Sequence, residues 1–177
     1  YSSIGHIGYI LAGLTTGSNE GIQSSITYLS IYIFMNLGIF SCIFMMKREN
    51  TYYENIDDLS GLSKNHPVMA ICMLLLLFSL AGIPPLAGFF AKFYVFMAIL
   101  KSEMYYLAIV GLTTTVISAY YYLRIIKIMY FDDASKPFDI QYNYGIKFTL
   151  FLSTILTLFY FLYPSPLFEL ILNISLI

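Results

Sequence analysis

Lys92 is the residue whose type and position most clearly predict chemistry in this sequence. It follows Phe89-Phe90-Ala91 and precedes Phe93-Tyr94-Val95-Phe96, and the next charged residue toward the C-terminus is Lys101. A lysine at the centre of a membrane helix costs about 2.5 to 3.5 kcal/mol, so it should face protein or water. Burial disfavours the charged form of an amine, which suits a group that gains and releases protons. The alternative is a structural lysine that binds carbonyl groups of a helix break.

The apolar segment that carries Lys92 contains a predicted break. Gly82, Pro84, Pro85 and Gly88 fall close together within it. Proline lacks a backbone N–H and glycine adopts non-helical conformations, so these residues interrupt a helix. Lipid cannot satisfy the freed backbone groups, and such breaks are tolerated where they are buried in protein or line a water-filled cavity. We therefore expect Lys92 and the break to border a hydrated cavity.

His6 is the second candidate for proton transfer. A histidine changes its charge near neutral pH, which suits a relay. Small residues surround it, namely Ser3, Gly5 and Gly8. Such residues allow close helix contacts, so hydrogen-bonded packing is an equally good interpretation of His6. Supporting candidates for holding water in the same cavity are Asn36, Thr113, Thr114, Thr115 and Ser118.

Two other polar features are interpreted as structural. The run Tyr120-Tyr121-Tyr122 precedes Arg124 and Lys127, a pattern typical of an aromatic belt with basic anchors at the membrane surface. His66 precedes Pro67 at the start of the broken segment. We interpret it as a helix cap, with a proton entrance as the alternative.

The composition indicates a membrane protein. Of the 177 residues, 59% are hydrophobic and 11% are charged, whereas a soluble domain has about 25% charged residues. A bilayer accepts the large apolar surface that a soluble fold would expose. The basic residues lie at the ends of apolar runs, so nothing predicts nucleic-acid binding. Cys42 and Cys72 lie inside apolar segments without ligand partners, so we expect buried thiols and no metal site.

The hydrophobic pattern predicts an all-α membrane protein with about five transmembrane helices in one domain, residues 1–177. A spanning helix needs about 20 apolar residues, and charged or Gly/Pro/Asn-rich segments separate the apolar runs. The third helix is expected to be discontinuous from Ala81 to Gly88. The helices are expected at about residues 1–16, 24–46, 67–100, 104–130 and 146–163, with an interfacial tail at 167–177.

The basic residues indicate whether the broken segment crosses the membrane once or forms a hairpin. With one crossing, seven basic residues share one side and Lys101 is alone on the other, whereas a hairpin gives four against four. Basic residues concentrate on the cytoplasmic or matrix side, so we predict one broken crossing. The seven residues are Lys47, Arg48, Lys64, Arg124, Lys127, Lys136 and Lys147.

Several motifs resemble the antiporter-like subunits of respiratory complex I, the NADH:ubiquinone oxidoreductase. They are Tyr1-Ser2-Ser3-Ile4-Gly5-His6-Ile7-Gly8-Tyr9, Met35-Asn36-Leu37-Gly38, Asp58-Leu59-Ser60-Gly61-Leu62 and, most specifically, the series from Leu80 to Lys92. The similarity is greatest to subunit 2 and extends, less closely, to Mrp-type sodium/proton antiporters. It covers nearly the whole chain, which resembles the C-terminal part of the family: the second inverted repeat plus the last helix. The family's proton-carrying lysine lies on the broken helix, and Lys92 matches it.

The resemblance implies a proton-translocating subunit of complex I, in which electron transfer from NADH to ubiquinone is coupled to proton pumping. FMN, iron–sulfur clusters and ubiquinone would bind elsewhere in that complex, so no cofactor and no redox chemistry are expected in this chain. The expected partners are other complex I membrane subunits, lipids, and a separate chain, from a split gene, that carries the missing N-terminal helices.

The expected location is the mitochondrial inner membrane, with a multi-pass topology, and the bacterial plasma membrane is the alternative. The basis is compositional: the sequence has no tryptophan, 15 Phe and 17 Tyr, which suggests an AT-rich organellar genome.

Two other functions remain open. A sodium/proton antiporter subunit of the Mrp type would use the same lysine without a redox partner, and the residues near Lys92 do not separate it from a complex I subunit. A membrane scaffold that only connects neighbouring subunits would not need a buried lysine, so Lys92 argues against it.

Overall fold

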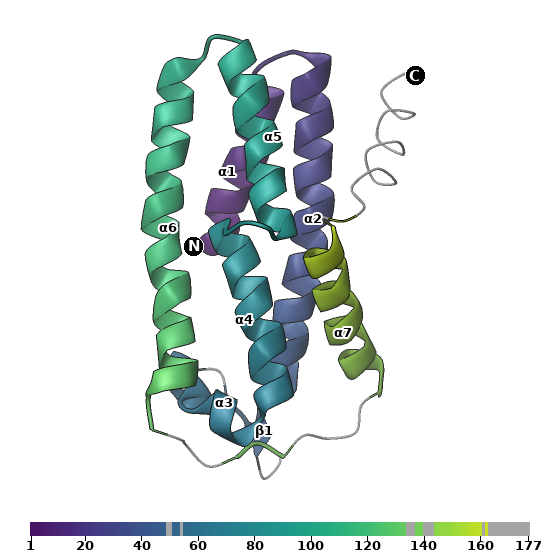
Figure 1. Ribbon diagram of the computed structural model, residues 1–177, viewed down its shortest axis with the longest axis vertical. Helices are drawn as coiled ribbons and strands as arrows, with labels where there is room; N and C mark the ends of the chain where they lie inside the picture. Colours follow the sequence, from purple (N-terminus) through teal and green to yellow (C-terminus); the bar gives the residue numbers. More distant parts are fainter. Residues whose placement is uncertain (49–50, 54, 134–136, 140–143, 161, 163–177) are drawn as a thin grey trace.

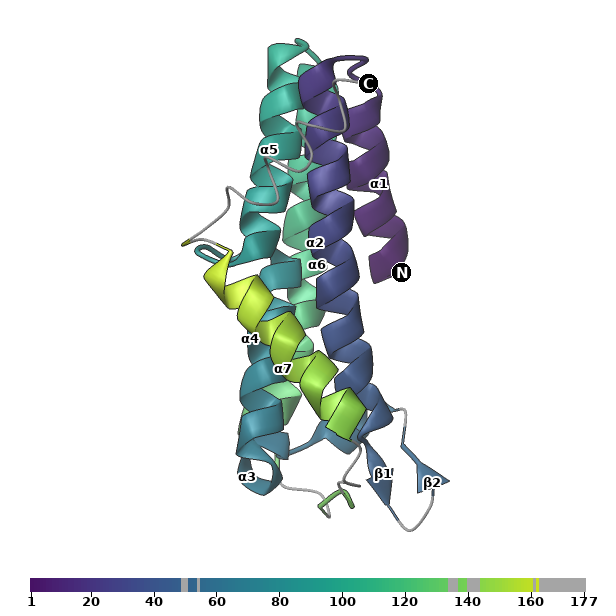
Figure 2. The same ribbon diagram turned by 90° about the vertical axis from the view of Figure 1, so that its right-hand side faces the viewer.

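The computed structural model is a bundle of helices with short connecting elements gathered at one end (Figures 1 and 2). It describes residues 1–48, 51–53, 55–133, 137–139, 144–160 and 162. In this part of the chain the α-helices are α1 (Ser2–Leu14), α2 (Asn19–Phe44), α3 (Leu62–Asn65), α4 (Pro67–Ala81), α5 (Ala87–Lys101), α6 (Tyr105–Phe131) and α7 (Tyr144–Phe159). The other elements are an antiparallel hairpin of β1 (Lys47–Arg48) and β2 (Thr51–Tyr52), and a 3-10 helix, η1 (Ile56–Leu59).

The helix lengths and their apolar surfaces fit a membrane protein. By length and composition, α2 and α6 can each cross a membrane, whereas α1, α4 and α7 are shorter apolar helices. Large apolar side chains such as Phe40, Val116 and Phe151 are exposed on the outside of the bundle, where lipid accepts them without cost. The prediction of an all-α membrane protein is confirmed, with the two-residue strands as a small addition.

The broken helix crosses the bundle once. In Figure 1, α4 leads up from the end near α3, and α5 continues from the break to the turn before α6. The predicted discontinuity is confirmed but is narrower than expected, because Ala81 still belongs to α4 and Gly88 already belongs to α5. Basic residues of the described part therefore separate as expected, with Lys47 and Lys64 near one end and Lys101 at the other.

Two predicted helix boundaries were wrong by more than a residue or two. The second helix begins at Asn19, not near residue 24, because Ser18 caps it: the Gly21 N–H donates to the Ser18 hydroxyl at 3.0 Å. The last helix ends at Phe159, whereas 163 was predicted. Residue 163, Lys136 and the tail 167–177 lie outside the described residues.

The core forms where α2 packs against α1, α4, α5 and α7. Met35 of α2, Leu76 of α4 and Val95 of α5 are fully buried there. Far from this core, Lys101 at the end of α5 pairs with Glu20 at the start of α2, with 2.7 Å between nitrogen and oxygen. The two halves of the broken helix are thus both held against α2, and this fixes the position of the break between them.

Candidate functional site

Lys92 lies in the second turn of α5 and reaches back across the helix break. Its side chain is 5% exposed, and its Nζ donates hydrogen bonds to the carbonyl oxygens of Leu80, at 3.0 Å, and Ala81, at 3.1 Å. These carbonyls end α4, where backbone acceptors lack helical partners and the helix dipole favours a cation. The structural interpretation of Lys92, as a residue that binds carbonyls of the break, therefore has direct support.

Two glycines give the lysine this position. Gly82 ends α4 with a φ of +90°, and a Cβ there would lie 3.1 Å from Cδ of Lys92. Gly88 lets α5 touch α4, because a Cβ there would lie 1.9 Å from the carbonyl oxygen of Ser79. The Gly88 N–H also donates to the Ser79 hydroxyl at 2.9 Å. Both glycines of the predicted break are thus required by close approach or by backbone conformation.

His6 is buried and bonded at both ring nitrogens. Its Nδ1 lies 2.8 Å from the hydroxyl of Tyr28 on α2, and its Nε2 lies 2.9 Å from the hydroxyl of Tyr122 on α6. The ring also stacks on Tyr32, with 4.7 Å between centroids. A neutral imidazole donates one such bond and accepts the other. His6 therefore joins three helices through hydroxyl groups that can exchange protons.

Tyr9 lies beside both His6 and Lys92. The Lys92 Nζ is 5.4 Å from the centroid of the Tyr9 ring, and the His6 ring centroid is 6.4 Å from the same ring. The Tyr9 hydroxyl lies 2.7 Å from that of Thr115 and 3.1 Å from that of Thr114. Tyr9 thus places an aromatic face beside the lysine while α6 holds its hydroxyl.

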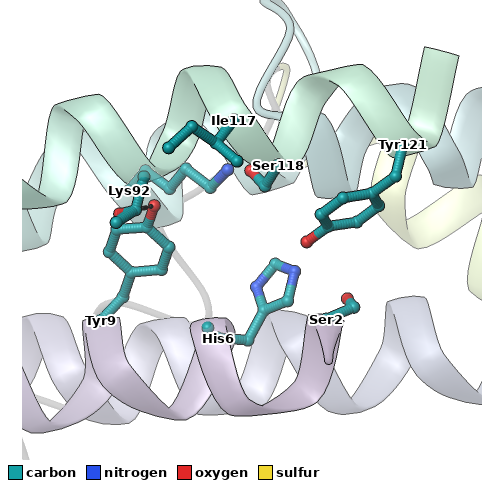
Figure 3. Close-up of a pocket in the computed structure, with 9 residues that line it drawn as sticks. Ser2, His6, Tyr9, Lys92, Ile117, Ser118 and Tyr121 are labelled. Carbon is teal, nitrogen blue, oxygen red and sulfur yellow. Dashed lines mark hydrogen bonds between the residues drawn. The ribbon is translucent and has the colours of Figure 1, made fainter.

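A cavity of about 130 Å³ connects these groups (Figure 3). Figure 3 shows His6 and Tyr9 rising from α1 toward Ser118 and Tyr121 of α6, with Lys92 entering beside Tyr9. A single water needs about 10 to 15 Å³ of such space and several polar partners, so the cavity has room for several waters. In the described part of the chain, no salt bridge pairs Lys92 with an Asp or Glu, and its ammonium is surrounded by the two carbonyls, the Tyr9 ring and this cavity.

The structure shows which of the residues predicted to hold water line the cavity. Thr114 and Ser118 line the cavity, whereas Asn36 does not. The hydroxyl of Thr113 is exposed and donates to the carbonyl of its own helix at Ile109. Among the residues that the structure describes, no group of three or more His, Cys, Asp or Glu side chains could hold a metal ion.

The interpretation of the tyrosine run as a surface belt was wrong for two of its members. Tyr120 is 72% exposed, but Tyr122 is 3% exposed and bonds His6, and Tyr121 lines the cavity. Residues three and four apart share a helix face, and Thr114, Ser118 and Tyr122 are spaced in this way. This spacing in the sequence indicates the polar face of α6. No comparable spacing in the sequence indicates that Tyr28 bonds His6.

The interpretation of His66 as a helix cap is confirmed for its position but not for its side chain. His66 occupies the N-cap position of α4, but its side chain makes no cap bond. Its Nε2 instead accepts the N–H of Phe138 at 3.0 Å, and the two rings stack. Burial lowers the pKa of His66, which favours the neutral form that this acceptor role requires. His66 thus fastens part of the segment between α6 and α7 to the start of α4.

Together the fold and the site define an all-α membrane protein in which a broken helix presents a buried lysine to a cavity that is also lined by a histidine and several hydroxyl side chains. The chain belongs to the NADH:quinone oxidoreductase/Mrp antiporter transmembrane family, whose model matches residues 1–118. The resemblance to the antiporter-like subunits is confirmed at this level.

Two bacterial relatives illustrate the similarity. The chain is 62% identical over 177 residues to NADH-quinone oxidoreductase subunit N of Pelagibacter ubique, covering 100% of this chain and 38% of the relative. It is 52% identical over 167 residues to the same subunit of Parvibaculum lavamentivorans, covering 94% and 35%. The chain therefore spans little more than a third of the length of these relatives.

Solved structures show the same fold. The chain matches a part of respiratory complex I from Thermus thermophilus with a TM-score of 0.79 and 27% identity, covering 96% of this chain and 38% of that one. It matches a part of the Mrp complex from Dietzia with a TM-score of 0.81 and 21% identity, covering 96% and 40%. The second match shows the fold alone, because its sequence identity is low.

Proposed function

We propose that this chain forms part of a proton-translocating subunit of a respiratory NADH:quinone oxidoreductase. In this proposal Lys92 gains and releases the proton, and His6 is a relay on the same cavity. The observation that carries the proposal is the buried Lys92 at a helix break, beside a cavity that it shares with His6. The high identity to bacterial subunit N supports the assignment to this enzyme.

The hydrogen bonds of Lys92 are compatible with a change of protonation. An ammonium group has three N–H donors, and a neutral amine keeps two. Two donors are enough for the carbonyls of Leu80 and Ala81. The side chain can therefore stay bound to α4 in both states, while the third proton is exchanged with water in the cavity. The structural role of Lys92 and a role in proton transfer do not exclude each other.

Coupling to electron transfer requires an element with two arrangements. The break between α4 and α5 is the candidate, because it joins two helices through residues 82–86 and lies against Lys92. FMN, iron–sulfur clusters and ubiquinone would bind in other subunits of the complex, and this chain would contribute no redox group.

The decisive experiment replaces Lys92 in the intact complex. Inverted membrane vesicles are supplied with NADH, and proton uptake is followed with a pH-sensitive dye alongside NADH oxidation. We expect Lys92→Met to lower the number of protons moved per NADH, whereas Lys101→Met, which removes an exposed lysine of α5, leaves it unchanged. Normal proton uptake by an assembled Lys92→Met complex would reject the proposal.

A second variant separates proton transfer from structure. Arginine keeps a positive charge and several N–H donors but does not release its proton in proteins. If Lys92 only binds the carbonyls, the Lys92→Arg complex should pump more protons per NADH than the Lys92→Met complex. If Lys92 carries protons, both variants pump poorly even when the complex assembles.

The runner-up function is a sodium/proton antiporter subunit of the Mrp type. The family model is the observation in its favour, because its description covers Mrp antiporters as well as NADH:quinone oxidoreductases. Such a subunit would exchange sodium for protons in vesicles without NADH, and its purified complex would lack an NADH-oxidising arm. A scaffold without transport would leave both assays unchanged in the Lys92 variants.

The finer predictions on location and partners belong to this proposal. The relatives described above are bacterial, which favours the bacterial plasma membrane over the mitochondrial inner membrane. The relatives' remaining length, including the earlier repeat, would come from a separate chain or from another part of the same polypeptide. Mass spectrometry of the native complex would identify the host membrane and that segment together.

A further inference from the structure

A second hollow region lies on the opposite side of the bundle from α1, between α4 and α7. It consists of two adjoining cavities of about 500 and 310 Å³. Val68, Cys72 and Phe151 line both of them, so the two form one continuous groove. Figure 2 shows α7 lying obliquely across the lower part of the bundle beside α2 and α4. We refer to this feature as the α4–α7 groove.

The walls of the groove suit a hydrocarbon chain. Its rim is formed by exposed apolar side chains, among them Val68, Phe148 and Phe151. The hydroxyl of Thr154, which lies in the floor, already donates to the carbonyl of Leu150. The floor residue Cys72 is a buried free thiol and behaves as a small apolar side chain. A polar ligand would find few partners along this surface.

One end of the groove is different, because it carries a cation and a phenol. Lys147 and Tyr144 line the larger cavity and belong to the first turn of α7, next to Met45 at the end of α2. The other end is lined by Leu158. Leu158 is eleven positions after Lys147, a helical rise of about 16 Å, which is close to one leaflet of a hydrocarbon core about 30 Å thick.

We propose that the α4–α7 groove binds an anionic phospholipid. One acyl chain lies along the groove toward Leu158, and the phosphate group lies against Lys147. Basic pockets between transmembrane helices on the cytoplasmic or matrix side bind anionic headgroups, and this is the side on which the charge distribution places Lys147. Its ammonium has three donors and so can serve a phosphate in addition to a protein partner. Tyr144 matches the preference of tyrosine for the headgroup level.

Photo-crosslinking identifies the occupant directly. The probe is p-benzoylphenylalanine introduced in place of Phe151, which is exposed and lines both cavities. The complex that contains this chain is irradiated in its native membrane, purified and analysed by mass spectrometry. We expect an adduct with the mass of a phospholipid. An adduct with a neighbouring protein subunit, or the absence of any lipid adduct, would overturn the proposal.

The charge preference is tested with two glutamine variants that lose the same charge. Lys147→Gln removes the cation of the groove, whereas Lys127→Gln removes an exposed lysine of α6 that does not line it. Delipidated complex is titrated with phosphatidylglycerol or phosphatidylcholine, and bound lipid is counted by native mass spectrometry. We expect about fivefold weaker binding of phosphatidylglycerol for Lys147→Gln only, since one lysine near an anionic group contributes about 1 kcal/mol. Equal effects of both variants would refute a role for Lys147.

The apolar part is tested with two tryptophan variants of equal exposure. Val68 is 71% exposed in the groove, and Val116 is 73% exposed on α6 outside it. We expect Val68→Trp to reduce the binding of both lipids by filling the groove, and Val116→Trp to leave it unchanged. Unchanged binding in Val68→Trp would show that the acyl chain lies elsewhere. These readouts count lipid and do not depend on proton transport.

Discussion

The contact between Gly88 and Ser79 supports a prediction that can be worked out from the structure. In Gly88→Ala, the new Cβ would lie 1.9 Å from the Ser79 carbonyl oxygen and 2.7 Å from its carbonyl carbon. These are backbone atoms inside α4, and no rotation of a side chain can move them away. The two halves of the broken helix must separate, and the Gly88 N–H would then lose its 2.9 Å bond to the Ser79 hydroxyl.

The cost has two parts. Overpacking a well-packed site costs about 1 to 3 kcal/mol, and a buried donor left without its acceptor costs about 1 to 3 kcal/mol. We expect Gly88→Ala to lower the free energy of unfolding by about 3 kcal/mol, which is a factor of roughly 100 in the folded-to-unfolded ratio. Lys92, one turn further along α5, would also move relative to the carbonyls of α4.

The assay is thermal or denaturant unfolding of the purified complex, together with the amount of assembled complex on a native gel. Gly8→Ala is the matched control, because nothing lies within 4 Å of a Cβ at Gly8. In a helix, alanine is more favourable than glycine by about 1 kcal/mol, so this control should be neutral or stabilising. If Gly88→Ala is as stable as Gly8→Ala, the close approach of α4 and α5 is wrong.

Three further predictions follow from individual contacts. Tyr9→Phe keeps the ring beside Lys92 but removes a hydroxyl that donates to the Gly111 carbonyl and bonds Thr114 and Thr115, so unfolding measurements should show a loss of about 1 kcal/mol. Glu20→Gln breaks an exposed ion pair; the loss should be below about 1 kcal/mol and disappear in high salt. In the folded protein the pKa of His66 is lowered from 6.5, so the unfolded state binds the proton more strongly. The hydrogen bond from the Phe138 N–H to His66 is therefore fully formed above the unfolded pKa and weakens as the pH falls through the lowered, folded pKa. After correction for intrinsic rates, amide exchange at Phe138 should become faster on acidification, and this change should be absent in His66→Asn.

The sequence alone determined the class of the protein and the position of its lysine. Both depend on local properties: the surplus of apolar residues selects the bilayer as solvent, and Gly82 and Pro84 interrupt a helix wherever it packs. The single crossing of the broken helix also followed from the sequence, because basic residues are distributed unequally between the two sides of a membrane.

Only the tertiary structure decided which groups surround Lys92 and His6. The partners of His6 come from positions 22 and 116 residues away along the chain, and their meeting depends on how each helix is rotated in the bundle. The run of tyrosines on α6 illustrates this. Successive residues differ by about 100° around a helix, so Tyr120 and Tyr122 face opposite ways, one to the outside and one to His6. The residue type is the same at both positions, so only the packing of α6 against α1 decides which tyrosine is buried.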